Sequence, residues 1–238
     1  LNDKNIYDYI DENELPINYD YYKIQYKSDI IRLTLLEKYG GTWLDASILL
    51  GNSLDNIFPM KKYDLVCTYT DKYNLDTKKI IESCLLRAPK NSLTIKLWRN
   101  EMINRVNIFT RNPFFMKLYL LRYNLKNNLP FLGYGYFWVF ISLQKILNEY
   151  KFLNNKIKFY NSKDTIYKWE VTRTFDSDNI LDKTINIKNS KTYKKIKFLK
   201  SPKSKNVKYD IMKFNHSDRK IIDKIETKKN SFFDLYLN

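Results

Sequence analysis

The order of apolar and polar positions along the chain predicts helices that alternate with strands. Residues 1–26 are polar, rich in tyrosine and interrupted by Pro16, so they predict a loop with short helical pieces. Residues 28–39 predict a helix with Ser28 as its N-cap and the Gly40-Gly41 pair as its stop. Residues 42–50 then predict a strand, which a turn at residues 51–53 closes.

The rest of the chain continues this alternation, although its last third is rich in Lys and Asn and less regular. Short apolar runs predict strands at residues 63–70, 80–88, 157–160 and 196–199. Further helices are predicted at residues 92–106, 113–126, 134–150 and 217–227. Together these elements indicate an α/β fold with a basic, less regular C-terminal portion.

The composition indicates a single globular domain over residues 1–238. Hydrophobic residues make up 44% of the chain and aromatic residues 16%, enough to form a core without disulfides or a structural metal. The chain starts with Leu1 rather than Met, which leaves open that a first N-terminal strand of the domain precedes it.

Features that would place the chain in or across a membrane are missing from the sequence. It contains no run of about 18 apolar residues and no export signal at its start. Cys67 and Cys84 are isolated thiols of the kind that a reducing compartment tolerates. The sequence therefore predicts a cytoplasmic protein.

The single histidine, His216, excludes several kinds of catalytic site. One His and two separate Cys cannot supply the four ligands of a zinc site. The chain also lacks the G-x-S-x-G turn of serine hydrolases, the phosphate-binding P-loop and the G-x-G-x-x-G dinucleotide motif. Zinc fingers and zinc hydrolases are therefore excluded, and no P-loop or dinucleotide motif is present, whereas a Ser-His-acid triad stays possible in principle.

The net charge of +16 lies mainly in the last third of the chain. Residues 151–238 hold 22 basic and 10 acidic side chains, a net of +12, and residues 1–150 hold 20 and 16, a net of +4. The excess is mostly lysine, whereas proteins that read bases rely on arginine. A solvated basic surface is the simplest interpretation. Attraction to an anionic membrane or a phosphate-bearing substrate is the alternative, and a nucleic-acid partner is disfavoured.

The helix predicted at residues 28–39 carries two charges on its apolar side. A spacing of 100° per residue puts Leu33 and Leu36 on one face and Ile30 and Thr34 on the opposite face. Asp29 and Arg32 fall on the apolar side and are three residues apart, so their side chains can meet. A mutual salt bridge is the simpler interpretation, and a polar wall that binds a ligand is the other.

The strand predicted after the two glycines carries a carboxylate near its end. In a strand, Asp45 and Ser47 would point to the same side of the sheet. Open α/β sheets bind ligands at the carboxyl ends of their strands. An Asp that merely starts a turn is the alternative for Asp45.

The string from Ser28 to Leu33, with Leu36 and residues 39–47 (YGGTWLDAS), closely resembles the sugar-nucleotide signature of the capsular polysaccharide synthesis glycosyltransferases. That family is related to the DxD sugar-binding region transferases and to the glucosyltransferase domains of large clostridial toxins. Weaker similarity extends to residues 85–91, 134–140 and 212–216. The resemblance implies a GT-A architecture, a Rossmann-like mixed sheet flanked by helices.

The resemblance also implies roles for individual residues. Asp29 and Arg32 would bind hydroxyls of the donor sugar, with Ser28 and Gly41 beside them in the donor site. Asp45 would contact the ribose and a divalent metal, Mn²⁺ or Mg²⁺. Ser47 stands where relatives carry a second aspartate, which makes tight metal binding by protein ligands alone less expected. One carboxylate with substrate phosphates can hold Mg²⁺, so Asp45 and a diphosphate could suffice.

The other candidate site residues each have a structural and a functional interpretation. His216 is a surface histidine or, by analogy with GT-A relatives, a third metal or phosphate contact. Trp43 is expected to fill the core rather than to stack on a base. The aromatic cluster packs a helix or forms an acceptor wall; its members are Phe131, Tyr134, Tyr136, Phe137, Trp138 and Phe140.

The sequence thus predicts a glycosyltransferase, with Asp45 and Arg32 as catalytic residues and Asp45 and His216 as metal ligands. Its donor would be a nucleoside diphosphate hexose, expected to be a UDP-sugar, and its acceptor a glycan that can be lipid-linked. The basic final third would favour peripheral docking at the anionic inner membrane face. The alternative is a non-enzymatic protein that binds nucleic acid or acidic glycans on a degenerate transferase fold.

Overall fold

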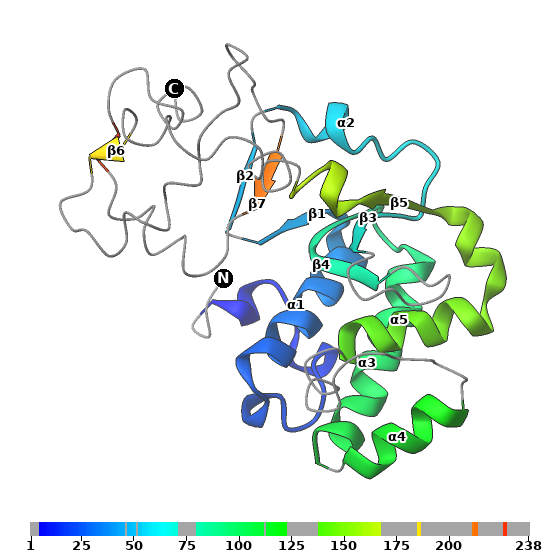
Figure 1. Cartoon of the computed structure of the whole chain (residues 1–238). Coiled ribbons are helices and arrows are strands. Elements are labelled where there is room, and N and C mark those ends of the chain that lie inside the picture. The colour runs from blue at the N-terminus through cyan, green and yellow to red at the C-terminus, as the bar shows by residue number, and fades with distance from the viewer. Residues whose placement is uncertain are drawn as a thin grey trace. The chain divides into compact units, whose positions relative to one another are not determined.

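The computed structural model describes residues 5–45, 47–50, 52–70, 80–111, 113–122 and 138–167, with short strands at 185–186, 211–213 and 226–227. The chain forms two compact units. One comprises Leu1–Leu44 and Met60–Asn161, and the other comprises Asp45–Pro59 and Ser162–Asn238. The larger sheet and the long helices belong to the first unit (Figure 1).

A four-stranded mixed sheet forms the centre of the first unit. Its strands are β1 (Gly41–Leu44), β4 (Ile80–Ala88), β3 (Leu65–Thr70) and β5 (Ile157–Asn161), in that spatial order. β4 is antiparallel to both β1 and β3, whereas β3 and β5 run parallel. The prediction of a mixed α/β fold is confirmed at this level, and the GT-A architecture stays a prediction.

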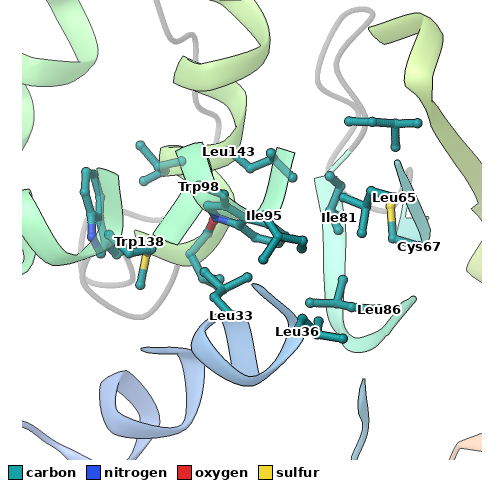
Figure 2. Close-up of a cluster of buried hydrophobic side chains, with 14 of the residues drawn as sticks. Leu33, Leu36, Leu65, Cys67, Ile81, Leu86, Ile95, Trp98, Trp138 and Leu143 are labelled. Atoms are coloured by element: carbon teal, nitrogen blue, oxygen red, sulfur yellow. The ribbon is translucent and has the colours of Figure 1, made fainter. Parts of the chain in front are cut away.

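Helices pack against one face of this sheet and enclose the main core (Figure 2). Leu33 and Leu36 of the first long helix meet Leu86 of β4 and Trp98 there. The Trp98 indole donates hydrogen bonds to the Val139 carbonyl at 2.8 Å and the Ser142 hydroxyl at 3.1 Å, so its polar atom is satisfied within the core. The helices are α1 (Ile24–Tyr39), α3 (Leu93–Arg111), α4 (Pro113–Arg122) and α5 (Trp138–Glu149).

The sheet is also buried on its other face. Side chains alternate along a strand, so Val66 and Thr68 of β3 and Leu85 of β4 point away from the helical core, yet all three are fully buried. Burial on both faces explains why β3 and β4 read as nearly continuous apolar runs rather than alternating patterns.

The N-terminal segment packs onto α1, as short helical pieces linked by loops. Three 3-10 turns (Ile6–Asp8, Glu12–Glu14 and Tyr19–Tyr21) enclose a small second core with Ile30. The Lys38 ammonium binds the carboxylates of Asp11 at 2.8 Å and Glu14 at 2.7 Å, which raises the pKa of Lys38 above its usual range. The loop with short helical pieces predicted for residues 1–26 is confirmed over residues 5–23, whereas residues 24–26 belong to the first long helix and residues 1–4 lie outside the described residues.

Three features of α1 differ from the prediction. The helix begins at Ile24, one turn before the predicted start, and its N-cap is Lys23. Ser28 is therefore inside the helix and does not cap it. The face expected to lie opposite the core is also buried, because Ile30 packs into the small second core and Thr34 accepts a hydrogen bond from Arg99 at 2.9 Å.

The single strand predicted at residues 42–50 is wrong, because two strands replace it. β1 ends at Leu44 and β2 (Ile48–Leu50) pairs with β7 (Ile211–Lys213) in the second unit. Between them the Ile48 amide donates to the Asp45 carbonyl at 2.9 Å, which closes a turn of the kind that Asp and Ser favour. The second unit also contains α2 (Leu54–Ile57) and the pair β6 (Ile185–Asn186) with β8 (Glu226–Thr227).

The other predicted elements are confirmed in their described parts, and the strand at 80–88 is confirmed over its full length. Residues 123–126 and 134–137 of two predicted helices lie outside the described residues. The helix predicted at residues 217–227 is wrong at its end, where Glu226 and Thr227 form β8, and its residues 217–225 lie outside the described residues. The strand predicted at 196–199 lies outside the described residues. None of the helices in the described part of the chain is both long and apolar enough to cross a membrane.

Candidate functional site

The charged pair predicted on the first helix forms in the structure. An oxygen of Asp29 lies 3.3 Å from a terminal nitrogen of Arg32, one turn further along α1. Only 11% of the Asp29 side chain and 8% of the Arg32 side chain are exposed. Two opposite charges are thus held together at the edge of an apolar core, where either one alone would be strongly destabilising.

Arg32 is fixed by contacts to three elements. Its Nε and one terminal nitrogen donate to the carbonyl and the hydroxyl of Ser28, at 3.3 and 2.9 Å. Its other terminal nitrogen donates to the Ser83 carbonyl of β4 at 2.5 Å. The guanidinium carbon also lies 5.1 Å from the centre of the Trp43 ring in β1. These contacts join α1 to the sheet and hold the guanidinium next to Asp29.

Trp43 has one contact that the sequence predicted and one that it did not. It is partly buried and packs against the main core, as expected for a core-filling residue. Its ring also faces the Arg32 guanidinium at cation–π distance. Trp43 therefore shields one side of the charged pair within the first unit.

Tyr26 is a neighbour of this pair that the sequence analysis missed. Burial raises the pKa of the Tyr26 phenol, and the negative charge of Asp29 raises it further. The phenol is therefore a neutral hydrogen-bond donor at physiological pH. Because Tyr26 precedes Asp29 by three residues, the i, i+3 spacing would have revealed it if the helix had been extended by one turn.

Ser83 was also missed, and no sequence signal could have found it. Its contribution is a backbone carbonyl, and it lies 51 residues from Arg32 in the chain. The packing of α1 against β4 brings this carbonyl to Arg32.

Both glycines at the end of α1 have positive φ, at +69° for Gly40 and +95° for Gly41. A Cβ atom on Gly40 would lie 2.4 Å from the Lys90 amide nitrogen, because residues 89–91 pack against the end of the helix. The Asn91 amide donates to the Glu37 carbonyl there at 2.9 Å. Gly41 has open space around its Cβ position, so its backbone is accessible at the start of β1.

Asp45 and Ser47 belong to the second unit. Asp45 follows the last residue of β1, and both side chains are partly exposed. Neither residue lies in a strand, so the prediction that strand geometry aligns their side chains is wrong. Their convergence with Asp29 and Arg32 on one donor stays a prediction.

The remaining predicted site residues are only partly described. His216 and residues 131–137 of the aromatic cluster lie outside the described residues. Trp138 and Phe140 lie on α5, where Trp138 is fully buried and Phe140 packs against the main core, in line with the helix-packing interpretation. Within the described ranges, no group of three or more His, Cys, Asp or Glu side chains could hold a metal.

Comparison with known protein families assigns most of the predicted site residues to a single family match. No curated protein and no solved structure matches the chain. The model of the family described as "Capsular polysaccharide synthesis protein" matches residues 1–209, a range that includes Ser28, Asp29, Arg32, Asp45 and Ser47 but ends before His216. The chain therefore belongs to the capsular polysaccharide synthesis protein family, which indicates a role in making capsule.

Proposed function

We propose that the chain is a glycosyltransferase that moves a hexose from a nucleoside diphosphate sugar, best matched by a UDP-sugar, to a capsular glycan acceptor. The donor would bind in a GT-A-type fold at the end of β1. The observation that carries this proposal is the buried Asp29–Arg32 pair, in a chain whose family makes capsular polysaccharide.

The energetics of the pair support a role beyond stability. A buried ion pair seldom stabilises a fold more than well-packed apolar residues would, because both charges lose their hydration. Asp29 and Arg32 occupy core-facing positions of α1 that Leu or Met could fill. A carboxylate held at such a position by a fixed guanidinium can instead accept hydrogen bonds from sugar hydroxyls.

Each residue of the site then has a defined task. Asp29 binds donor hydroxyls, and Arg32 orients Asp29 as well as contacting the sugar. Ser28 fixes the guanidinium through the hydrogen bonds described above. The accessible Gly41 backbone lets the donor approach β1, and Ser47 lines the turn that follows.

Asp45 is proposed to contact the ribose and a divalent metal, Mg²⁺ or Mn²⁺. Cleavage of the bond between the anomeric carbon and the diphosphate leaves negative charge on the departing oxygens. A cation near these oxygens stabilises the transition state more than the ground state. A single carboxylate fits this task because substrate phosphates and waters supply the other ligands of such cations. His216 is a further candidate ligand.

Donor hydrolysis with and without Mn²⁺ tests this proposal, after a panel of nucleotide sugars has been screened for thermal stabilisation. The D45A variant is expected to lose about 100- to 1000-fold in metal-stimulated donor turnover, as is typical when one electrostatic contact to the transition state is removed. D55N is the matched control, because Asp55 is an exposed carboxylate on α2 in the same unit. Equal turnover by D45A and D55N would contradict the proposal. Stabilisation by oligonucleotides but by no nucleotide sugar would favour the nucleic-acid-binding alternative.

A further inference from the structure

One side of α4 exposes a continuous row of large apolar side chains. Phe114 is 61% exposed and Leu121 69% exposed, and Phe115 and Leu118 complete the row. At 100° per residue, these four side chains and that of Arg122 occupy an arc of about 120° on the helix. We call the four apolar residues the α4 ridge.

The opposite side of α4 is fixed to the first unit, so the ridge faces outward. The Tyr119 hydroxyl donates to the Glu101 carboxylate of α3 at 2.7 Å, and the Tyr119 ring packs edge-on against Trp138. Leu120 is buried in the main core. Figure 1 shows α4 at the outer end of the helical layer, away from the sheet.

The residues near the ridge in the sequence include basic but no acidic side chains, and two of the basic ones are paired in the fold. Residues 102–148 contain six basic residues and no acidic residue, but Arg105 and Lys145 lie beside Glu101, at 3.8 and 2.9 Å. Arg122 is exposed and shares the arc of the ridge. An exposed apolar row beside an exposed arginine, in a chain with a net charge of +16, is complementary to the surface of an anionic bilayer.

We propose that the α4 ridge docks the protein on an anionic lipid bilayer. Phe114, Leu118 and Leu121 enter the boundary between headgroups and acyl chains, with α4 lying along the surface, and Arg122 contacts the lipid phosphates. The proposal differs from docking through the basic final third of the chain, because it assigns contact to a helix of the first unit. It does not depend on the transfer reaction.

Sedimentation with vesicles tests this surface in the full chain. The probes are vesicles of phosphatidylcholine with 30% phosphatidylglycerol and vesicles of phosphatidylcholine alone. F114S/L121S is expected to bind the anionic vesicles about 10- to 100-fold more weakly, since two large apolar side chains no longer leave water. R122Q is expected to weaken binding about fivefold, because one basic residue near such a surface contributes about a factor of five.

The matched control is I17S/I24S, which removes two apolar side chains that are 83% and 65% exposed on the N-terminal segment and α1. This control is expected to bind like the unchanged chain. The single variant L121S repeats the test at the most exposed ridge position if the double variant loses its cooperative melting transition.

Three results would overturn the proposal. One is the absence of sedimentation with anionic vesicles, and another is equal binding by F114S/L121S and the control. The third is a dimer of the unchanged chain, seen by light scattering, that F114S/L121S dissociates, because a second copy would then cover the ridge. None of these results bears on donor turnover, so the failure of this proposal is distinguishable from that of the proposed function.

Discussion

Two pairs of opposite charges are buried in the same unit, and they are built differently. Asp29 and Arg32 lie three residues apart on α1, and Arg32 reaches one carbonyl of the sheet. Glu101 and Lys145 lie 44 residues apart on α3 and α5, with 2.9 Å between the ammonium and a carboxylate oxygen. The first pair is local to one helix, whereas the second joins distant parts of the helical layer.

The Glu101 pair has a complete set of partners from the fold itself. One Glu101 oxygen accepts from Tyr119 of α4 at 2.7 Å and the other from Lys145. Lys145 also binds Glu149 at 2.8 Å. Burial lowers the pKa of Lys145, but its hydrogen bonds to Glu149 and Glu101 outweigh this, so the pKa lies above its usual value.

The two buried ion pairs are expected to serve different purposes, one in stability and the other in donor binding. The Glu101 pair cross-links three helices, so its loss should appear mainly as a loss of stability. Loss of the Asp29 charge leaves Arg32 buried without its ionic partner and lowers stability too, but its distinguishing effect should be a loss of donor turnover by the folded protein. Variants of the two pairs can therefore confirm or refute this division.

The largest effect is expected from K145M. It removes the closer of the two cations beside the buried Glu101 carboxylate and leaves only Arg105, at 3.8 Å. The free energy of unfolding should therefore fall by about 3 kcal/mol, the lower end of the range for a broken buried ion pair. Urea denaturation measures this loss. K96M is the control, because Lys96 is an exposed lysine of α3. Equal midpoints for K145M and K96M would show that the Glu101 pair does not support the fold.

D29N should produce the next largest effect, and it should do so in activity. The variant keeps the shape of the side chain but removes the charge proposed to bind the donor, so donor turnover should fall about 100- to 1000-fold. Turnover is measured well below the melting temperature of each variant. E101Q should give the reverse pattern, with lower stability and unchanged turnover of the folded protein. If D29N keeps full donor turnover, the Asp29 pair does not serve donor binding and the proposed difference between the two pairs is wrong.

Y119F should have a smaller effect on stability. It removes one hydrogen bond to a buried carboxylate, and such bonds to charged groups contribute about 1.5–3 kcal/mol. Thermal or urea unfolding measures the change, with Y21F as the control because Tyr21 is highly exposed. A Y119F variant as stable as Y21F would indicate that water replaces the phenol at Glu101.

The smallest effect is expected for Y26F, and only at alkaline pH. The pKa of Tyr26 is raised in the folded protein, so the unfolded chain loses this proton first as the pH rises through about 10. Stability therefore falls from there up to the folded pKa. Y26F should reduce the decline in melting temperature between pH 9 and 11. An unchanged decline would indicate that the pKa of Tyr26 is not raised in the folded protein.

The sequence predicted the elements whose signals are local. β4 was predicted over its full length because a continuous apolar run lies between turn residues. The stop at Gly40-Gly41 was predicted because both positions need positive φ, which glycine adopts without strain. The pairing of Asp29 with Arg32 followed from a spacing of three residues on a helix. The family assignment rested on the same contiguous stretch and is confirmed.

The sequence by itself therefore determined the features that depend on neighbouring residues. These are the helix and strand propensities, the glycine turn and the contacts one helical turn apart. The tertiary structure decided the rest. It buried Ile30 and Thr34 on a second face of α1, ended β1 before Asp45, placed the Ser83 carbonyl beneath Arg32 and brought Lys145 to Glu101. Each of these contacts joins residues far apart in the chain, and such partners are selected by the packing of whole elements rather than by any local pattern.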